Sequence, residues 1–165
     1  MSGNQSSRLC ARPGRSTPDV AIDCEPVPGA HLVTQRPGYE HHGIYVGNGR
    51  VVHYAGFGRS MHRGPIEETT LERFAAGREI RVRVHPTAMF TGQDAVRRVR
   101  SRLGEDHYRL LSNNCEHLCA WALFGENRSS QVEACLSHPG LACRVAIAML
   151  KGWIAARGRG GLLAA

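Results

Sequence analysis

The residues best suited to chemistry are one cysteine at the start of an apolar stretch and three histidines around a hairpin. In LLSNNCEHLCAWALFG, residues 110–125, Asn113 and Asn114 are natural helix N-cap residues, which places Cys115 in the first helical turn. There the unpaired backbone amides and the helix dipole stabilise a thiolate, which predicts a pKa below the free value of about 8.5. The same amides, supported by Asn114 as the cap, are candidate oxyanion donors.

Other roles for the cysteines compete with this interpretation. Most intracellular cysteines pack as small apolar residues, and we expect this of Cys119, Cys135 and Cys143, which lack such a cap. His117 lies about 200° around the helix from Cys115, so we expect it to be a surface or structural residue. A zinc site from Cys115, Cys119 and two histidines is a weaker alternative, because this spacing lacks a second paired cluster. The sequence therefore predicts a thiol nucleophile and no metal.

The three histidines belong to one predicted hairpin. HHGIYVGNGRVVH, residues 41–53, forms two strand-like runs joined at Gly47-Asn48-Gly49. Adjacent side chains on a strand point to opposite faces, so either His41 or His42 shares a face with His53, but not both. An ordinary hairpin with exposed histidines is an alternative that composition leaves open.

The length of the hairpin loop decides between the two histidines. A two-residue turn at Asn48-Gly49 would place His42 on the face of His53. A three-residue loop, with Gly49 left-handed beside a bulge, would instead pair Gly43 with His53 and place His41 on that face, within reach of the second imidazole. We favour the three-residue loop, because it sets the one residue without a side chain opposite a bulky ring. His42 is then structural.

Strand-like runs come first along the chain and helix-like runs come later, which predicts an α+β fold with helices packed on an antiparallel sheet. The expected strands are 31–34, the two arms of the hairpin and 79–84; the expected helices are 69–76, 95–103, 115–124 and 141–156, with a glycine-rich loop over 56–65. Residues 1–28, rich in Ser, Pro, Arg and Gly, are predicted to be a flexible leader. Cys10 and Cys24 fall within it and have no assigned role.

Composition limits the partners. The 165 residues are enough for one domain, and Lys and Arg outnumber Asp and Glu by 21 to 14, which gives a net charge of +7. This charge favours anionic partners, but aromatic residues are only 6% of the chain and do not alternate with the basic ones. No nucleic acid is therefore expected, and a lipid surface ranks higher. The N-terminus lacks a secretory apolar stretch, so we expect reduced thiols and a cytoplasmic protein.

Two motifs together resemble a known family. YEHHGIYVGNGRVVHY, followed further along the chain by NNCEHLCAWALFG, is similar to the lecithin:retinol acyltransferase domain. ENRSSQVE, residues 126–133, resembles the stretch that follows the cysteine helix of that family. The likeness covers residues 28–133. The family includes the H-Ras-like suppressor phospholipase/acyltransferases and a set of bacterial proteins, and the chain resembles a bacterial-type member.

This resemblance implies a circularly permuted papain-like fold, in which the histidines precede the cysteine. It implies a catalytic domain over residues 29–135, with Cys115 as nucleophile, His41 as base and His53 as the residue that orients His41. Cys115 would attack an acyl ester of a glycerophospholipid and form a thioester, from which water, an amine or an alcohol takes the acyl group. This chemistry needs no cofactor and no metal.

The C-terminal segment, residues 136–165, contains an apolar stretch with positive charges. Residues 141–157 are short for a bilayer span and include Arg144 and Lys151, seven positions apart and so nearly on one helix face. This pattern favours an amphipathic helix at an anionic lipid surface, which would make a cytoplasmic protein membrane-associated. A helix packed on the domain with its cations outward is an equal alternative.

Two rival functions remain open at this point. A cysteine amidase or peptidase of papain-like fold would keep the same nucleophile and change the substrate. A non-catalytic binding module would use the scaffold alone. The presence of His41, His53 and Cys115 together counts against the second rival.

Overall fold

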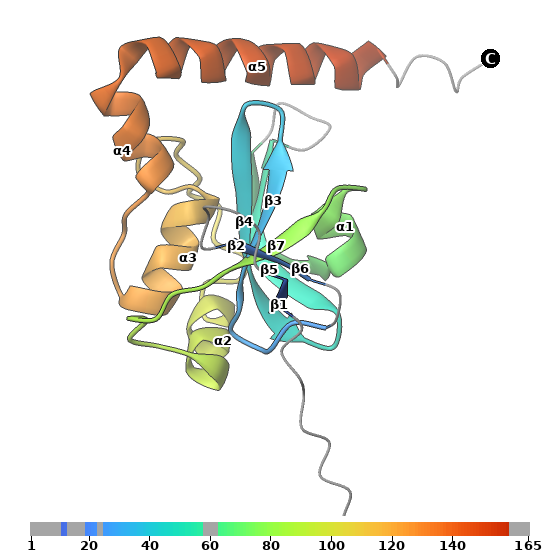
Figure 1. The fold of residues 1–165 in the computed structure, drawn as a ribbon, viewed down its shortest axis with the longest axis vertical. Coiled ribbons are helices and arrows are strands. Elements are labelled where there is room, and N and C mark those ends of the chain that lie inside the picture. Colours follow the sequence, from blue (N-terminus) through green and yellow to red (C-terminus); the bar gives the residue numbers. More distant parts are fainter. Residues whose placement is uncertain (1–10, 13–18, 23–24, 58–62, 159–165) are drawn as a thin grey trace, which may run out of the picture.

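An antiparallel sheet runs through the centre of the molecule, with helices on both of its faces (Figure 1). The structure, a computed structural model, describes residues 11–12, 19–22, 25–57 and 63–158. Within these ranges seven strands pair in the order β1-β2-β7-β3-β4-β5-β6, always antiparallel. They are β1 (Ala11–Arg12), β2 (Asp19–Ile22), β3 (His31–Arg36), β4 (Tyr39–Gly47), β5 (Arg50–Phe57), β6 (Arg63–Thr70) and β7 (Ile80–Arg83). The predicted α+β class with an antiparallel sheet is confirmed.

The helices divide the core into two clusters. They are α1 (Leu71–Ala75), α2 (Gly92–Arg100), α3 (Cys115–Phe124), α4 (Ser130–Ser137) and α5 (Pro139–Gly158). Figure 1 shows α2 and α3 on one side of the sheet and α1 on the other. Because alternate residues of a strand face opposite sides, β4 directs Ile44 and Val46 toward the α2–α3 cluster and Tyr45 toward the α1 cluster.

The β4–β5 hairpin differs from the predicted loop. Asn48 and Gly49 form a two-residue turn, both in the left-handed region with φ of 53° and 66°. A register shift then occurs between Tyr45 and Gly47, which adds one residue to β4. The predicted three-residue loop is therefore wrong, and a two-residue turn followed by a bulge replaces it. One extra residue exchanges the faces of all the side chains beyond it, so the bulge has the effect expected of the longer loop.

The bulge sets the faces of the histidines. The rings of His41 and His53 both lie against Phe74 of α1, with ring centres 5.2 Å and 5.6 Å from its own. His42 points to the other face of the sheet, where it is fully buried and contacts Gln131 of α4. The structure thus separates the two adjacent histidines by strand alternation.

Two segments form strands that were not expected from the sequence. Residues 63–65 were expected to end a loop but begin β6, where Pro65 is tolerated because β6 is an edge strand of the sheet. β1 and β2 lie within the expected leader, and the backbone of β2 pairs with β7. The remainder of residues 1–24, including Cys10 and Cys24, and residues 58–62 lie outside the described residues.

The chain after the sheet ends in two helices, of which α5 extends past one end of the sheet (Figure 1). α4 follows the cysteine helix α3 and lies between it and α5 in the chain. In the described part of the chain, no helix combines the length and apolar character needed to cross a membrane.

Gly43 provides a test of this packing. A Cβ at Gly43 would lie 2.6 Å from Val51 Cγ1 and 2.9 Å from Phe74 Cε2, closer than real Cβ contacts allow. We expect Gly43→Ala to lower the free energy of unfolding by about 1–3 kcal/mol, because Phe74 has to move within a close-packed core. Denaturant unfolding measures this. Gly140→Ala is the matched control, since a Cβ there meets no atom within 4 Å and the variant should be as stable as the parent or more so.

Candidate active site

The N-terminus of α3 presents Cys115 as its first residue. Asn114 occupies the N-cap, and its side-chain oxygen accepts hydrogen bonds from the backbone N–H of Glu116 at 2.9 Å and of His117 at 3.1 Å. The backbone N–H of Asn114 donates in return to Nδ1 of His117 at 3.4 Å. His117 is therefore a buried cap residue rather than a surface residue.

The environment of the thiol differs from the expectation of a stabilised thiolate. Cys115 is only 4% exposed, and this burial raises the pKa of its thiol to about 11. Hydrogen bonds from the backbone N–H groups of His42 and of Cys115 itself act in the opposite direction but are outweighed. The predicted low pKa is thus wrong for the free protein, because desolvation is a larger effect than the helix terminus.

The raised pKa predicts the reactivity of Cys115 toward iodoacetamide. Only the thiolate reacts, so the alkylation rate at Cys115 should rise tenfold per pH unit from pH 7 and level off only near pH 11. Mass spectrometry of the Cys115 peptide at a series of pH values measures this rate separately from the more exposed Cys135 and Cys143. A rate that has already levelled off at about pH 8, close to the free thiol pKa, would contradict the assignment.

His41 and His53 form a direct pair on the α1 face. Nε2 of His41 lies 2.9 Å from Nδ1 of His53, which also lies 2.8 Å from the carbonyl oxygen of Tyr54. A carbonyl oxygen only accepts, so His53 carries its proton on Nδ1 in this arrangement. Burial lowers the pKa of both imidazoles, and that of His41 falls well below its ordinary value. The pair is therefore neutral near pH 7.

The other nitrogen of His53 faces a carboxylate. Nε2 of His53 is 3.5 Å from Oε1 of Glu67, and within the described residues this buried nitrogen has no hydrogen-bond partner. A neutral imidazole protonated on Nδ1 presents a lone pair there, so the position accepts a hydrogen bond from any donor that enters.

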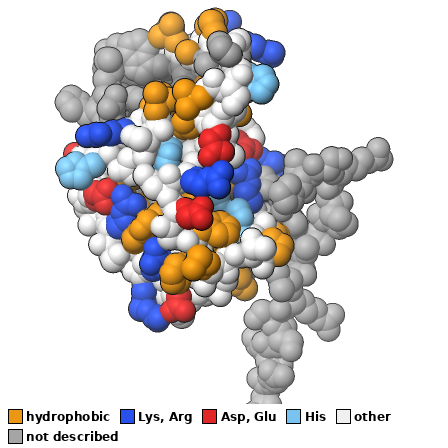
Figure 2. All heavy atoms as spheres, turned by 90° about the vertical axis from the view of Figure 1, so that its left-hand side faces the viewer, with side chains coloured by type: hydrophobic (Ala, Val, Ile, Leu, Met, Phe, Trp, Pro, Cys, Tyr) orange, Lys and Arg blue, Asp and Glu red, His pale blue; other side chains and the backbone are white. Residues whose placement is uncertain are grey.

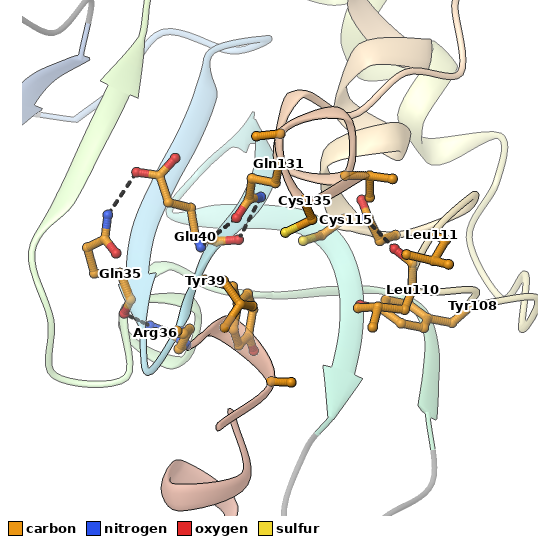
Figure 3. Close-up of a pocket in the computed structure, with 16 residues that line it drawn as sticks. Gln35, Arg36, Tyr39, Glu40, Tyr108, Leu110, Leu111, Cys115, Gln131 and Cys135 are labelled. Atoms are coloured by element: carbon orange, nitrogen blue, oxygen red, sulfur yellow. Dashed lines mark hydrogen bonds between the residues drawn. The ribbon is translucent and has the colours of Figure 1, made fainter. Parts of the chain in front are cut away.

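Two cavities meet between the histidine pair and the cysteine. Cys115 lines a cavity of about 500 Å³ bounded mainly by apolar side chains of α4, α5 and the loop before α3 (Figure 3). His41 and His53 line a smaller, polar cavity of about 230 Å³. Arg36 and Tyr39 line both cavities. The described contacts of Cys115 and His41 include no hydrogen bond between the thiol and the imidazole.

Arg36 and Tyr39 were not identified from the sequence. The guanidinium of Arg36 donates to the carbonyl oxygens of Phe74 at 2.6 Å and Ala75 at 3.2 Å, which fixes it at the C-terminal end of α1. The ring of Tyr39 meets that of His41 edge-on, with ring centres 6.5 Å apart. Both residues flank the turn at Pro37-Gly38. The Pro-Gly pair predicts a turn there, but nothing in the local sequence predicts that its neighbours line the site.

A buried carboxylate next to the nucleophile was also missed. Glu116 accepts hydrogen bonds from the hydroxyls of Ser129 at 2.5 Å and Ser130 at 2.6 Å and from the backbone N–H of Gln131 at 3.1 Å. Burial alone raises its pKa, but these hydrogen-bond donors outweigh burial and the pKa is lowered to about 2. All three donors come from ENRSSQVE, residues 126–133, so this segment was the sequence feature that could have pointed to Glu116.

The packing prediction for the other cysteines is correct for Cys119, while Cys135 is only partly buried and Cys143 is exposed, so the prediction is wrong for Cys143. Cys119 is fully buried in the α2–α3 cluster. Burial raises the pKa of its thiol well above the ordinary value. Among the residues that the structure describes, no three His, Cys, Asp or Glu side chains are arranged to hold a metal ion.

Comparison with known proteins agrees with the two sequence motifs. The sequence profile of the lecithin retinol acyltransferase family matches residues 24–128. This range contains His41, His53 and Cys115. The chain belongs to the lecithin retinol acyltransferase family.

Three mammalian relatives of this family member are similar over most of its length. Human phospholipase A and acyltransferase 2 is 30% identical over 148 residues, which cover 79% of this chain and 91% of that protein. Human phospholipase A and acyltransferase 4 is 28% identical over 144 residues, or 78% and 88% of the two chains. Mouse phospholipase A and acyltransferase 3 is 29% identical, with 72% and 83% covered. These relatives give no support to the bacterial-type assignment.

Proposed function

We propose that this protein is a cysteine-dependent acyltransferase or phospholipase A-like hydrolase that acts on acyl esters of phospholipids through a thioester. The observation that carries the proposal is the arrangement of the site: a capped helix N-terminus presents Cys115 in a large apolar cavity, and the paired histidines line the cavity beside it. The names of the relatives support the reaction class. The order of histidines before cysteine supports the permuted papain-like relationship, which we propose with it.

In the proposed reaction Nε2 of His41, the nitrogen that faces Nδ1–H of His53 at rest, takes the proton of Cys115 as Sγ attacks the ester carbonyl carbon. During this transfer His53 keeps its Nδ1–H on the carbonyl oxygen of Tyr54. The bond from that carbon to the alcohol oxygen then breaks, and the leaving oxygen receives the proton from His41. The acyl group remains on Sγ as a thioester. Water, an amine or an alcohol repeats the attack on this thioester, with its proton passing through His41 back to the thiol.

The electrostatics of the site favour proton transfer during attack rather than a thiolate formed beforehand. The pKa of Cys115 is raised to about 11 and that of His41 is lowered by burial, so both groups are neutral at rest. The backbone N–H groups of His42 and Cys115 face the thiol and are the candidate oxyanion donors. The reaction also requires the His41 ring and the thiol to approach at the border formed by Arg36 and Tyr39.

The surface beside the large cavity supports a lipid substrate. Ile147, Leu150 and Ile154 are 48%, 55% and 56% exposed, and their spacing places them on one face of α5. Arg144 and Lys151 lie along one side of this stripe and are exposed as well. Figure 2 shows hydrophobic side chains at the end of the molecule formed by α4 and α5. An apolar stripe bordered by cations suits an anionic lipid surface.

We therefore expect a variant with Ile147, Leu150 and Ile154 all replaced by Ser to bind anionic vesicles at least about tenfold more weakly, because three side chains no longer enter the lipid interface. Sedimentation with vesicles containing phosphatidylserine measures this. The control replaces Val84 and Met89, exposed apolar residues elsewhere on the molecule, by Ser. If the control weakens binding as much as the α5 variant, α5 is not the binding surface.

The function itself is tested by incubating the protein with phospholipid vesicles carrying a labelled acyl chain and, separately, with a peptide library. The proposal expects release or transfer of the labelled acyl group, and its loss in Cys115→Ala. Cleavage confined to peptides would replace it with the peptidase alternative. No turnover in either assay, with a folded protein, would favour the binding module.

A further inference from the structure

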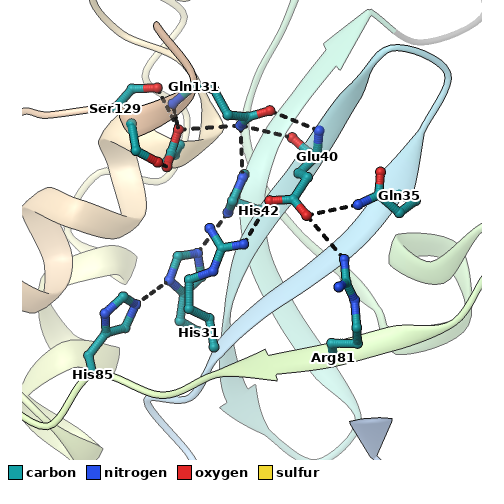
Figure 4. A network of polar contacts seen from close by, with 11 residues as sticks. His31, Gln35, Glu40, His42, Arg81, His85, Ser129 and Gln131 are labelled. Atoms are coloured by element: carbon teal, nitrogen blue, oxygen red, sulfur yellow. Dashed lines mark hydrogen bonds and ion pairs between the residues drawn. The ribbon is translucent and has the colours of Figure 1, made fainter. Parts of the chain in front are cut away.

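Gln131, His42, His31 and His85 form a continuous chain of polar contacts (Figure 4). The amide nitrogen of Gln131 lies 2.9 Å from Nε2 of His42. Nδ1 of His42 lies 2.9 Å from Nε2 of His31, and Nδ1 of His31 lies 2.7 Å from Nε2 of His85. His31 and His42 are buried, and His85 is half-buried at the end of the chain of contacts. The proposed reaction uses none of these side chains.

The backbone of β4 fixes the orientation of the Gln131 amide. The backbone N–H of Glu40 donates to Oε1 of Gln131 at 2.9 Å, so the oxygen of the amide has to face this donor. The amide nitrogen lies 3.3 Å from the carbonyl oxygen of the same Glu40. With the oxygen assigned, the NH₂ group is the one that faces His42.

This orientation determines the tautomers along the chain. Because an NH₂ group only donates, Nε2 of His42 accepts and its proton lies on Nδ1. That N–H donates to Nε2 of His31, whose proton in turn lies on Nδ1 and points to His85. Protonation of His42 on Nε2 would set two donors against each other. Burial lowers the pKa of His31 well below its ordinary value, which agrees with a neutral ring.

The same chain connects to both sides of Cys115. The Gln131 amide nitrogen is 3.3 Å from the carboxylate of Glu116, the residue after the nucleophile on α3. The backbone N–H of His42, on β4, donates to the thiol. A displacement of Gln131 would therefore move the helix end that carries Cys115 relative to the strand that carries the His42 amide. A small misplacement of reacting groups is enough to lower a rate by about 100-fold.

We propose that Gln131 and His42 are positioning residues: the neutral His42 ring, hydrogen-bonded to Gln131, holds β4 and the Cys115 end of α3 in the arrangement that the reaction requires. The inference rests on the proposed function for its kinetic consequence. The structural part, the Nδ1–H tautomers and the Gln131 donor, does not depend on which substrate is used.

Gln131→Glu tests the proposal through its pH dependence. A carboxylate at position 131 can still accept from the Glu40 backbone but cannot donate to His42, so kcat near pH 8 should fall between about 10-fold and 100-fold relative to the parent. Lowering the pH adds a proton between the carboxylate and His42 and restores a donor, so the ratio of variant to parent kcat should rise toward acid. Gln131→Met, similar in length without a donor, should lose activity without this recovery.

Among the described residues, charged and titratable groups lie near this contact on several elements. They include Glu116 and Cys115 on α3, His31 on β3, His41 and Glu40 on β4, Arg81 and Arg83 on β7, and His85 beyond β7. Gln93→Glu makes the same chemical change at an exposed position of α2 and is the matched control, with an activity ratio independent of pH. A Gln131→Glu profile parallel to that of the parent would overturn the positioning role.

Nitrogen-15 NMR of the histidine rings decides the structural part separately from activity. In the parent protein at pH 7 both His42 and His31 should show a protonated Nδ1 and an unprotonated Nε2. In Gln131→Glu the His42 Nε2 signal should change to the protonated form on acidification. An Nε2–H tautomer or a charged ring for His42 in the parent would overturn the proposal, even if the protein proves active on phospholipid. The expected tautomers in a protein without phospholipid turnover would leave this arrangement standing and reject the proposed substrate.

Discussion

Replacing Cys115 by Ala is expected to lower kcat for acyl release from phospholipid by on the order of 10⁴-fold or more, because the proposed thioester forms on its sulfur at the capped N-terminus of α3. The loss should appear in kcat rather than in vesicle binding, since the thiol is buried and contributes nothing to the α5 surface. A steady-state assay with labelled phospholipid, normalised to folded protein by circular dichroism, measures it.

Cys143→Ala is the matched control for this prediction. Cys143 is an exposed free cysteine on α5, so its removal should leave kcat unchanged. A Cys115→Ala variant that retains more than about a tenth of the parent activity would show that the reaction proceeds through another group, such as a water activated by His41.

The second prediction with a large effect distinguishes the roles of the adjacent residues His41 and His42. His41→Ala should lower kcat by about 10²-fold to 10⁴-fold, the range for loss of a general base. His42→Ala should lower kcat less, by no more than about 100-fold, because its ring holds the site without touching the reacting atoms. Its main effect should be on stability, with the free energy of unfolding lowered by about 1–3 kcal/mol because buried partners lose a hydrogen bond.

Kinetics and denaturant unfolding on the same preparations measure both quantities. His107→Ala, at an exposed histidine, is the control and should change neither. The opposite ranking, with His42→Ala the less active variant and His41→Ala close to the parent, would mean that the working histidine lies on the α3 face of the sheet.

The elements of the fold that rest on local signals could be predicted from the sequence. Asn114 before an apolar run and Gly125 after it define α3 to the residue, and Asn48-Gly49 defines the hairpin. The antiparallel α+β class follows from the order of these signals. The edge strand β6 was missed because Pro65, Glu67 and Glu68 are poor strand formers, and its partner β5 decides its conformation.

The errors at the site arise from interactions between elements that are distant in the sequence. The helix terminus predicts a low thiol pKa, but Cys115 is buried in the folded protein, and this burial reverses the direction. A bulge was expected at the hairpin, but it lies in β4 between Tyr45 and Gly47 beside a two-residue turn, and it gives His41 and His53 the faces that were expected of a three-residue loop. The Gln131–His42–His31 chain joins residues from three elements, and no local pattern specifies such contacts.

The central claim is that Cys115 carries the acyl group. The most direct measurement is mass spectrometry of the protein quenched in acid during turnover of a phospholipid of known acyl chain. We predict an added mass equal to that acyl group on the Cys115 peptide, removed by hydroxylamine as a thioester is, and absent from Cys115→Ala. Turnover with no adduct on Cys115 under conditions that trap the intermediate, or an acyl group on another residue that persists in Cys115→Ala, would contradict the account.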